Sequence, residues 1–273
     1  MQSFRVDLTS VASALAVGRF LKGVRVSDLN GRTAVVTGGA SGIGAACVRA
    51  FADAGAHVIV ADLNGAAAEV LAKEVGATAW QVDLSDTAAL ATVSLDCDIL
   101  INNAGIQFVS PIEEFPPEKF SLIMKLMLEA PFLLIRAALP RMYERNFGRI
   151  INISSVHGLR ASEFKSAYVA AKHGLEGLSK VTALEGGAHG VTSNCINPAY
   201  VRTPLVEKQI ADQARLHSIS EEEVVPQIML TESAIKRLVE PSEVASLALW
   251  IAGPDAGMVT GSSYTMDGGW SAR

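Results

Sequence analysis

Residues 33–44 read Thr33-Ala34-Val35-Val36-Thr37-Gly38-Gly39-Ala40-Ser41-Gly42-Ile43-Gly44. The first five residues are mostly apolar and β-branched, which predicts a strand, and a helical pattern over residues 45–54 follows the glycines. Glycines at such a junction permit a tight turn and let backbone amides at a helix N-terminus approach a pyrophosphate. The turn therefore serves either to pack the helix on the strand or to bind phosphate. The candidate phosphate-binding residues are Gly38, Ser41, Gly42, Ile43 and Gly44.

Strand and helix patterns alternate along the rest of the chain, which predicts an α/β protein with a parallel sheet covered on both faces. One domain is expected, because no repeat and no second-domain pattern is present. The predicted strands are residues 33–37, 57–61, 78–82, 98–101, 149–153, 191–196 and 263–266. The predicted helices are residues 45–54, 66–75, 85–93, 117–143 with a bend near Pro131, 166–188 and 241–251.

The bulk properties exclude several classes of protein. The 273 residues suit one large domain. The net charge is -5 and no basic stripe is present, so no nucleic-acid partner is expected. No apolar run reaches the roughly 18 residues of a membrane span. The three cysteines are widely spaced and lack a CxxC pair, which predicts reduced thiols, a cytoplasmic protein and no metal site.

Two segments depart from the regular alternation. Residues 1–30 combine a mildly apolar stretch with basic residues but show no clear cleavage site, so we expect an N-terminal extension or a start codon placed too early. Residues 31–273 then form the catalytic domain. Within it, residues 204–236 are polar and helical in pattern, and an insertion at the carboxyl edge of such a sheet lies over the ligand crevice. This insertion is either a substrate lid or a surface hairpin without a role.

A serine, a tyrosine and a lysine form the candidate catalytic group. Tyr168 and Lys172 are four residues apart, so they share one face of a helix. Lowering a phenol pKa from about 10 to about 7 takes roughly 4 kcal/mol, and one positive charge about 4 Å away at an effective dielectric of about 20 supplies it. The resulting tyrosinate takes the proton of an alcohol as its hydride leaves, while Ser155 holds the same oxygen. A Tyr-x-x-x-Lys pair alone is usually a surface pair, so the prediction depends on the combination with the glycine turn.

Acidic residues at two strand ends indicate the cofactor. Asp62 ends the second strand, where its carboxylate can accept hydrogen bonds from both ribose hydroxyls. A 2′-phosphate there meets like charge, and no arginine occupies positions 63 or 64, so NAD is predicted rather than NADP. Asp62 as a helix N-cap is compatible with this role. Asp83 ends the third strand and reaches either the adenine amino group or a helix cap.

Together these residues resemble the short-chain dehydrogenase/reductase family over residues 31–273. The matching pieces are residues 37–44, Asp62, Asp83, residues 102–105, Ser155, Tyr168, Lys172, the Asn197-Pro198 turn, Thr203 and residues 267–269. The resemblance implies that Tyr168 and Lys172 also contact the cofactor, that Asn103 borders its adenosine side, and that Pro198, Val201 and Thr203 line the nicotinamide end.

Further stretches resemble one group in this family, the bacterial D-3-hydroxybutyrate dehydrogenases. These stretches are residues 105–107, 156–159, 165–168, 201–210 and 268–270. In that group a Gln, a His, a Lys and a lid Gln surround the substrate carboxylate, and a short hydroxy acid needs such a cation and donors close to the serine and tyrosine. The corresponding residues here are Gln107, His157, Lys165 and Gln209, with Ser155, Tyr168 and Trp270 completing the substrate site. A loop histidine and a solvated lysine are the ordinary alternatives for His157 and Lys165.

Two departures from the family pattern stand out. Met127 occupies the position, 28 residues before Ser155, where the family has an asparagine that supports a proton-relay water. A thioether is only a weak acceptor, so proton exchange needs another path or turnover suffers. Ala199-Tyr200 replaces the Gly and the following Trp that are common in the close relatives, which keeps an aromatic wall but adds a hydroxyl.

The resemblance implies a Rossmann-like, doubly wound sheet of strand order 3-2-1-4-5-6-7 and a homotetramer paired through residues 117–143 and 166–188. The implied activity is the NAD-dependent, reversible oxidation of (R)-3-hydroxybutyrate to acetoacetate. A different alcohol, sugar, polyol or 3-oxoacyl substrate is the alternative within enzymes. A binding protein on a decayed dehydrogenase scaffold is the alternative outside them, with Met127 as its only support.

Overall fold

The computed structural model describes residues 28–272. The predicted N-terminal extension therefore lies almost wholly outside the described residues. Leu29, near the start of the described part, is buried, and its backbone amide donates to the Ala54 carbonyl at 2.9 Å. Leu29 is thus already part of the folded domain.

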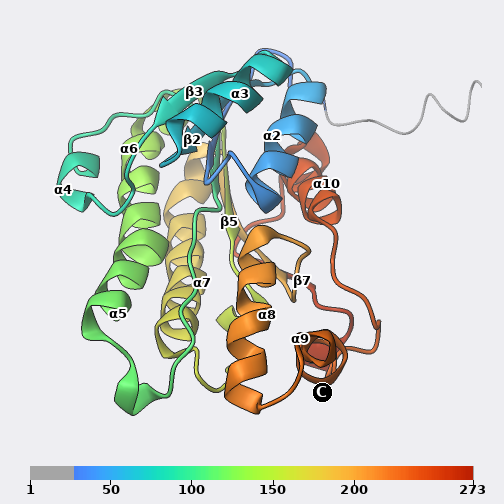
Figure 1. Ribbon diagram of the computed structural model, residues 1–273. Helices are drawn as coiled ribbons and strands as arrows, with labels where there is room; N and C mark the ends of the chain where they lie inside the picture. Colours follow the sequence, from blue (N-terminus) through green and yellow to red (C-terminus); the bar gives the residue numbers. More distant parts are fainter. Residues whose placement is uncertain (1–27, 273) are drawn as a thin grey trace, which may run out of the picture.

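A single parallel sheet of seven strands forms the centre of the domain (Figure 1), in the order β3-β2-β1-β4-β5-β6-β7. This order and the doubly wound architecture confirm the prediction. The strands are β1 Thr33–Thr37, β2 His57–Asp62, β3 Thr78–Gln81, β4 Ile99–Asn102, β5 Gly148–Ile153, β6 Val191–Pro198 and β7 Ser263–Met266.

Helices cover both faces of the sheet, because successive strand residues point to opposite faces and both must be buried. In β1, Ala34 and Val36 pack into one core cluster while Val35 packs into the other. One face carries α2 Gly42–Asp53, α3 Gly65–Val75 and α10 Pro241–Ala252. The other carries α4 Thr87–Leu90, α5 Pro117–Met124, α6 Ala130–Glu144 and α7 Ser166–Gly186.

The predicted helix 117–143 is not continuous. A π-helical turn, η3 Lys125–Glu129, separates α5 from α6, and the amide of Ala130 donates to the Lys125 carbonyl five residues back. Pro131 explains the change, since it has no N–H for the carbonyl of Met127, four residues before it. The irregular turn thus begins before the proline near which the bend was predicted, and it places Met127 at the site described below.

The insertion between β6 and α10 folds as a helical pair, as predicted from residues 204–236. It contains α8 Pro204–His217, α9 Glu221–Val224 and a second π turn, η6 Val225–Met229. Val206, Ala214, Val224 and Met229 form a small apolar cluster of their own, against which Tyr200 packs. Short 3-10 turns complete the fold: η2 Ile112–Glu114, η4 Val156–Gly158, η5 Gly187–His189, η7 Pro254–Ala256 and η8 Trp270–Ala272.

Within residues 28–272, no helix has the length and apolar character needed to cross a membrane. The same part of the chain contains no group of three or more His, Cys, Asp or Glu side chains arranged to hold a metal ion.

Candidate active site

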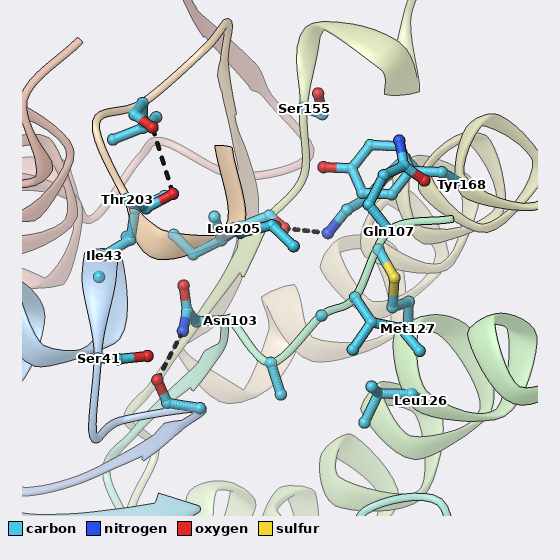
Figure 2. Close-up of a pocket in the computed structure, with 18 of the residues that line it drawn as sticks. Ser41, Ile43, Asn103, Gln107, Leu126, Met127, Ser155, Tyr168, Thr203 and Leu205 are labelled. Carbon is cyan, nitrogen blue, oxygen red and sulfur yellow. Dashed lines mark hydrogen bonds between the residues drawn. The ribbon is translucent and has the colours of Figure 1, made fainter. Parts of the chain in front are cut away.

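A cavity of about 550 Å³ lies at the carboxyl ends of the central strands. Figure 2 shows Ser41, Ile43 and Asn103 at one end of this cavity and Gln107, Ser155 and Tyr168 at the other. The predicted cofactor residues that line it are Gly38, Ser41, Gly42, Ile43, Asp62, Asp83, Asn103, Pro198, Val201 and Thr203. The predicted catalytic and substrate residues that line it are Gln107, Ser155, His157, Lys165, Tyr168, Lys172 and Gln209. Gly44 and Trp270 are the two predicted site residues outside this lining.

The glycine turn makes a cradle at the N-terminus of α2. Gly38 and Gly42 have φ of 60° and 53°, left-handed values that favour glycine. A Cβ on Gly44 would lie 2.1 Å from the Gly38 carbonyl oxygen, so Gly44 serves the close packing of the turn rather than the cavity wall. The side chain of Ser41 makes no capping bond, and the first amides of a helix have no partner within it. This arrangement fits a pyrophosphate.

Asn103 fixes the glycine turn against β1. Its side-chain amide donates to the carbonyls of Thr37 and Gly38 at 2.9 and 3.1 Å. The Thr37 hydroxyl in turn accepts from the backbone amides of Asn103 and Ala104 at 2.9 and 3.1 Å. Asn103 therefore lines the cavity beside the glycine turn, and its side-chain amide holds the shape of that turn.

The two acidic residues at the strand ends do not cap helices. Asp62 accepts from the backbone amides of Ala40 and Asn64 at 3.0 and 2.9 Å, and Asn64 itself caps α3. Each Asp62 oxygen keeps a second lone pair for a ribose hydroxyl. Asp83 accepts from the amide and hydroxyl of Ser85, bonds that lower its pKa, and Asp86 caps α4. The N-cap alternatives for Asp62 and Asp83 are therefore wrong.

Ser155, Tyr168 and Lys172 come together from β5 and α7. The Ser155 hydroxyl accepts from the His157 amide at 3.2 Å and hydrogen-bonds the Tyr168 hydroxyl. Burial raises the pKa of Tyr168 to about 12, although the bond from Ser155 opposes this. The Lys172 ammonium lies 5.6 Å from the Tyr168 ring centroid and donates to the Ile153 carbonyl at 2.6 Å. The predicted lowering of the tyrosine pKa to about 7 is wrong for this arrangement, because burial is the largest effect on this pKa and raises it.

The same cavity contains a second buried lysine, at the N-terminal end of α7. Lys165 is 2% exposed, and its ammonium donates to the Tyr200 hydroxyl at 2.8 Å. Burial lowers the pKa of Lys165 to about 8 and raises that of Tyr200 to about 12. The solvated-lysine alternative is therefore wrong. The sequence indicated the aromatic ring and the added hydroxyl of Tyr200 but not its bond to Lys165, because no local pattern shows a contact between residues 35 positions apart.

His157 is also buried rather than a loop residue in solvent. It is 4% exposed, its Nε2 lies 2.9 Å from the Ser162 hydroxyl, and its Nδ1 lies 3.3 Å from that of Ser155. Burial first, and then the charge of Lys165, lowers the pKa of His157 to about 3. The imidazole is therefore neutral at physiological pH and acts as a hydrogen-bonding group.

The remaining predicted substrate residues differ in position. Gln107 accepts from the Phe108 amide at 3.1 Å, and Gln209 of α8 donates to the Leu205 carbonyl at 3.2 Å. Trp270 does not line the cavity, which corrects its prediction as a substrate contact. Its ring packs edge-on against His157 with 5.3 Å between centroids, so it supports that histidine from behind.

Met127 lies at the boundary between this cavity and the helices below it (Figure 2). It is 1% exposed and packs with Ile123, Ala167 and Ala171. A Cβ on Gly105 would stand 3.4 Å from the Met127 methyl carbon. The space at this position is thus filled by an apolar side chain next to the tyrosine.

We expect Met127→Asn to leave kcat unchanged or to lower it. A buried amide among these apolar neighbours loses partners at a cost of about 1–3 kcal/mol. The profile of kcat against pH and the thermal unfolding midpoint measure this. Met127→Leu, which conserves volume and apolarity, is the matched control and should behave as the unmodified protein. A tenfold gain in kcat for the asparagine variant would instead show that a proton relay is missing.

Comparison with known proteins agrees with this geometry. The family model for short chain dehydrogenase matches residues 32–214. The chain is 48% identical over 259 residues to the D-beta-hydroxybutyrate dehydrogenase of Rhizobium meliloti (strain 1021), covering 89% of this chain and 99% of the relative. It is 42% identical over 257 residues to the protein of the same name from Cupriavidus necator, covering 90% of this chain and 100% of the relative.

A solved structure has the same fold. The putative 2-deoxy-D-gluconate 3-dehydrogenase from Agrobacterium tumefaciens, solved with bound NADP, superposes with a TM-score of 0.79 at 31% identity, covering 91% of this chain and 100% of that chain. The chain therefore belongs to the short-chain dehydrogenase family, and it is an oxidoreductase that uses a nicotinamide cofactor.

Proposed function

We propose that this protein catalyses the NAD-dependent, reversible oxidation of (R)-3-hydroxybutyrate to acetoacetate. The observation that carries the proposal is Lys165. Its ammonium is buried in the same cavity as Ser155 and Tyr168, and its hydrogen-bond partner is a phenol rather than a carboxylate. A buried charge is costly unless it is paired, and a substrate carboxylate supplies the missing partner.

Other residues of the cavity suit the same anion. Gln107, Gln209 and the neutral His157 line it, and the Tyr200 hydroxyl, which accepts from Lys165, has its own proton left to donate. A neutral sugar or polyol would leave the Lys165 ammonium without a counter-charge. This favours a hydroxy acid over the other alcohols that the family oxidises.

The proton transfer uses the serine and the tyrosine. Ser155 holds the substrate oxygen, and Tyr168 exchanges a proton with it. With its pKa raised to about 12 by burial, Tyr168 is protonated at neutral pH and ready to donate to a ketone. The Lys172 ammonium, on the same face of α7, stabilises the phenolate that this donation leaves, and in the oxidation direction the same phenolate takes the proton of the alcohol. The residues around the glycine turn and residues 198–203 would hold the nicotinamide cofactor, which supplies hydride transfer when bound.

The insertion serves this site as a lid, since Pro204, Leu205, Val206 and Gln209 at the start of α8 line the cavity. We also infer a homotetramer paired through α5, α6 and α7. Four large apolar side chains on these helices are exposed, which supports a covered face: Phe120, Phe132, Val181 and Leu184.

The preference for NAD over NADP is assigned to Asp62. A 2′-phosphate beside its carboxylate meets a like charge, so kcat/KM with NAD should exceed that with NADP by about tenfold or more. Asp62→Ala should lower the ratio of kcat/KM with NAD to kcat/KM with NADP. Asp83→Asn, which changes a charge farther along the same edge of the sheet, should leave this ratio unchanged. Steady-state rates with both nucleotides measure this. Equal use of NADP by the unmodified protein would contradict the assignment.

Formation of NADH across a panel of substrates tests the proposed reaction. The panel contains (R)-3-hydroxybutyrate, its S enantiomer, secondary alcohols, sugars and a 3-hydroxyacyl thioester. The proposal expects the R acid to give the highest kcat/KM. A sugar or a thioester in first place would reassign the substrate, while leaving the oxidoreductase class intact.

A further inference from the structure

We propose that Glu176, one turn beyond Lys172 on α7, is a positioning residue for proton transfer at Tyr168. Its buried carboxyl group ties together, through hydrogen bonds, the segments that carry the active-site groups, and its charge acts on the Lys172 ammonium one turn away on the same helix. This inference rests on the proposed use of Tyr168 and Lys172 but not on the identity of the substrate.

The hydrogen bonds of Glu176 run toward the site rather than toward the surface. The side chain is 5% exposed. One carboxyl oxygen accepts from the Asn197 side-chain amide at 2.5 Å, and the other accepts from the Ser263 hydroxyl at 2.6 Å. The same Asn197 nitrogen donates to the Ser155 carbonyl at 2.8 Å. Glu176 therefore connects α7, β6 and β7 to the residue that holds the substrate oxygen.

The turn after Ser155 is shaped to accommodate this carboxyl group. A Cβ on Gly158 would lie 2.5 Å from the Ser154 hydroxyl and 3.0 Å from a Glu176 oxygen. The turn η4, which carries His157, thus packs directly on Glu176, and only a glycine fits between them. The Asn197 bond also fixes the residue before Pro198, where the cofactor-side wall of the cavity begins.

Two elements bring titratable side chains close to Lys172. Tyr168 and Glu176 approach it from α7, and Cys195 approaches it from β6. Ile153 of β5 offers only a carbonyl, and Met127 of the π turn is uncharged. Burial lowers the pKa of Lys172 to about 8, and Cys195 and Glu176 oppose this shift.

Loss of the Glu176 charge should therefore narrow the pH range in which the site works. Without this charge the pKa of Lys172 falls further, and the ammonium is lost at a lower pH. The phenolate of Tyr168 then loses its stabilising cation, so alcohol oxidation should fail earlier on the alkaline side. Glutamine keeps the shape and can still accept from Asn197, while the Ser263 hydroxyl can rotate to accept from its amide.

The experiment compares pH profiles of kcat and KM for the unmodified protein, Glu176→Gln and Glu185→Gln. Glu185 is an exposed acid on the same helix and serves as the matched control. (R)-3-hydroxybutyrate with NAD is the probe, or the best alcohol of the panel. We expect Glu176→Gln to lower the alkaline midpoint of kcat by about one pH unit. Its NADH affinity, measured by fluorescence, should be unchanged. The Glu185→Gln control should keep the midpoint of the unmodified protein.

A second pair of variants, with side chains one carbon shorter, separates the effect of charge from any folding defect. Glu176→Asp and Glu176→Asn have side chains of the same size but differ in charge. The alkaline midpoint of kcat should therefore lie lower in the asparagine variant than in the aspartate variant. Lower thermal stability without a shift in either neutral variant would overturn the proposal, because Glu176 would then be a structural hydrogen-bonding residue. An unmodified protein that oxidises no alcohol would instead overturn the proposed function.

Discussion

Tyr168→Phe is expected to lower kcat by about 10²–10⁴-fold, the range that general acid-base catalysis contributes. The change removes the hydroxyl that Ser155 holds and keeps the aromatic ring, which packs with Met127, Ala167 and Ala171. NADH affinity, measured by fluorescence titration, should therefore change little.

Tyr264→Phe is the matched control for this variant. Tyr264 lies in β7 and its ring packs on Trp250, 6.0 Å between centroids, away from the cavity lining. The control should keep its full rate. Activity of Tyr168→Phe close to that of the unmodified protein would rule out the proposed proton transfer.

Lys165→Ala is expected to raise KM for 3-hydroxybutyrate by about tenfold to a hundredfold. The change removes a charge-assisted hydrogen bond to the substrate carboxylate, worth about 1.5–3 kcal/mol. An uncharged alcohol should show little change in KM. Lys180→Ala, at an exposed lysine of α7, is the matched control, and equal effects on acid and alcohol would indicate a structural role for Lys165.

The same lysine predicts a pH dependence. Burial lowers the pKa of Lys165 to about 8, so its positive charge is present below that pH and is lost as the pH rises through it. KM for the hydroxy acid should therefore rise above about pH 8 in the unmodified protein, and this rise should be absent from Lys165→Ala and from reactions of a neutral alcohol.

The strand-and-helix alternation made the architecture predictable, because hydrophobic periodicity depends on burial of both sheet faces. Even β7 was placed at its observed bounds, residues 263–266. The π turn at residues 125–129 was not predictable in this way. It depends on how the helix redistributes hydrogen bonds around Pro131, and the sequence pattern gives only the position of the proline.

Motif spacing identified the residues that meet at the cavity but did not show how deeply each side chain is buried. Tyr168 and Lys172 share a helix face, as expected, yet burial raises the tyrosine pKa where the spacing predicted a decrease. Trp270 follows the family pattern in sequence but packs behind His157. Glu176 stands four residues after Lys172, a spacing that placed it on the same helix face, but only its contacts across β6 and β7 connect it to the site.

We propose that the buried Lys165 selects a substrate by its carboxylate. The most direct test compares kcat/KM for (R)-3-hydroxybutyrate with that for its methyl ester, using NAD and following NADH formation. The two substrates share the reacting alcohol and differ in the charge at the other end. We expect the acid to be favoured by about tenfold or more in kcat/KM, since the ester cannot pair with the ammonium. An ester turned over as well as the acid would contradict it.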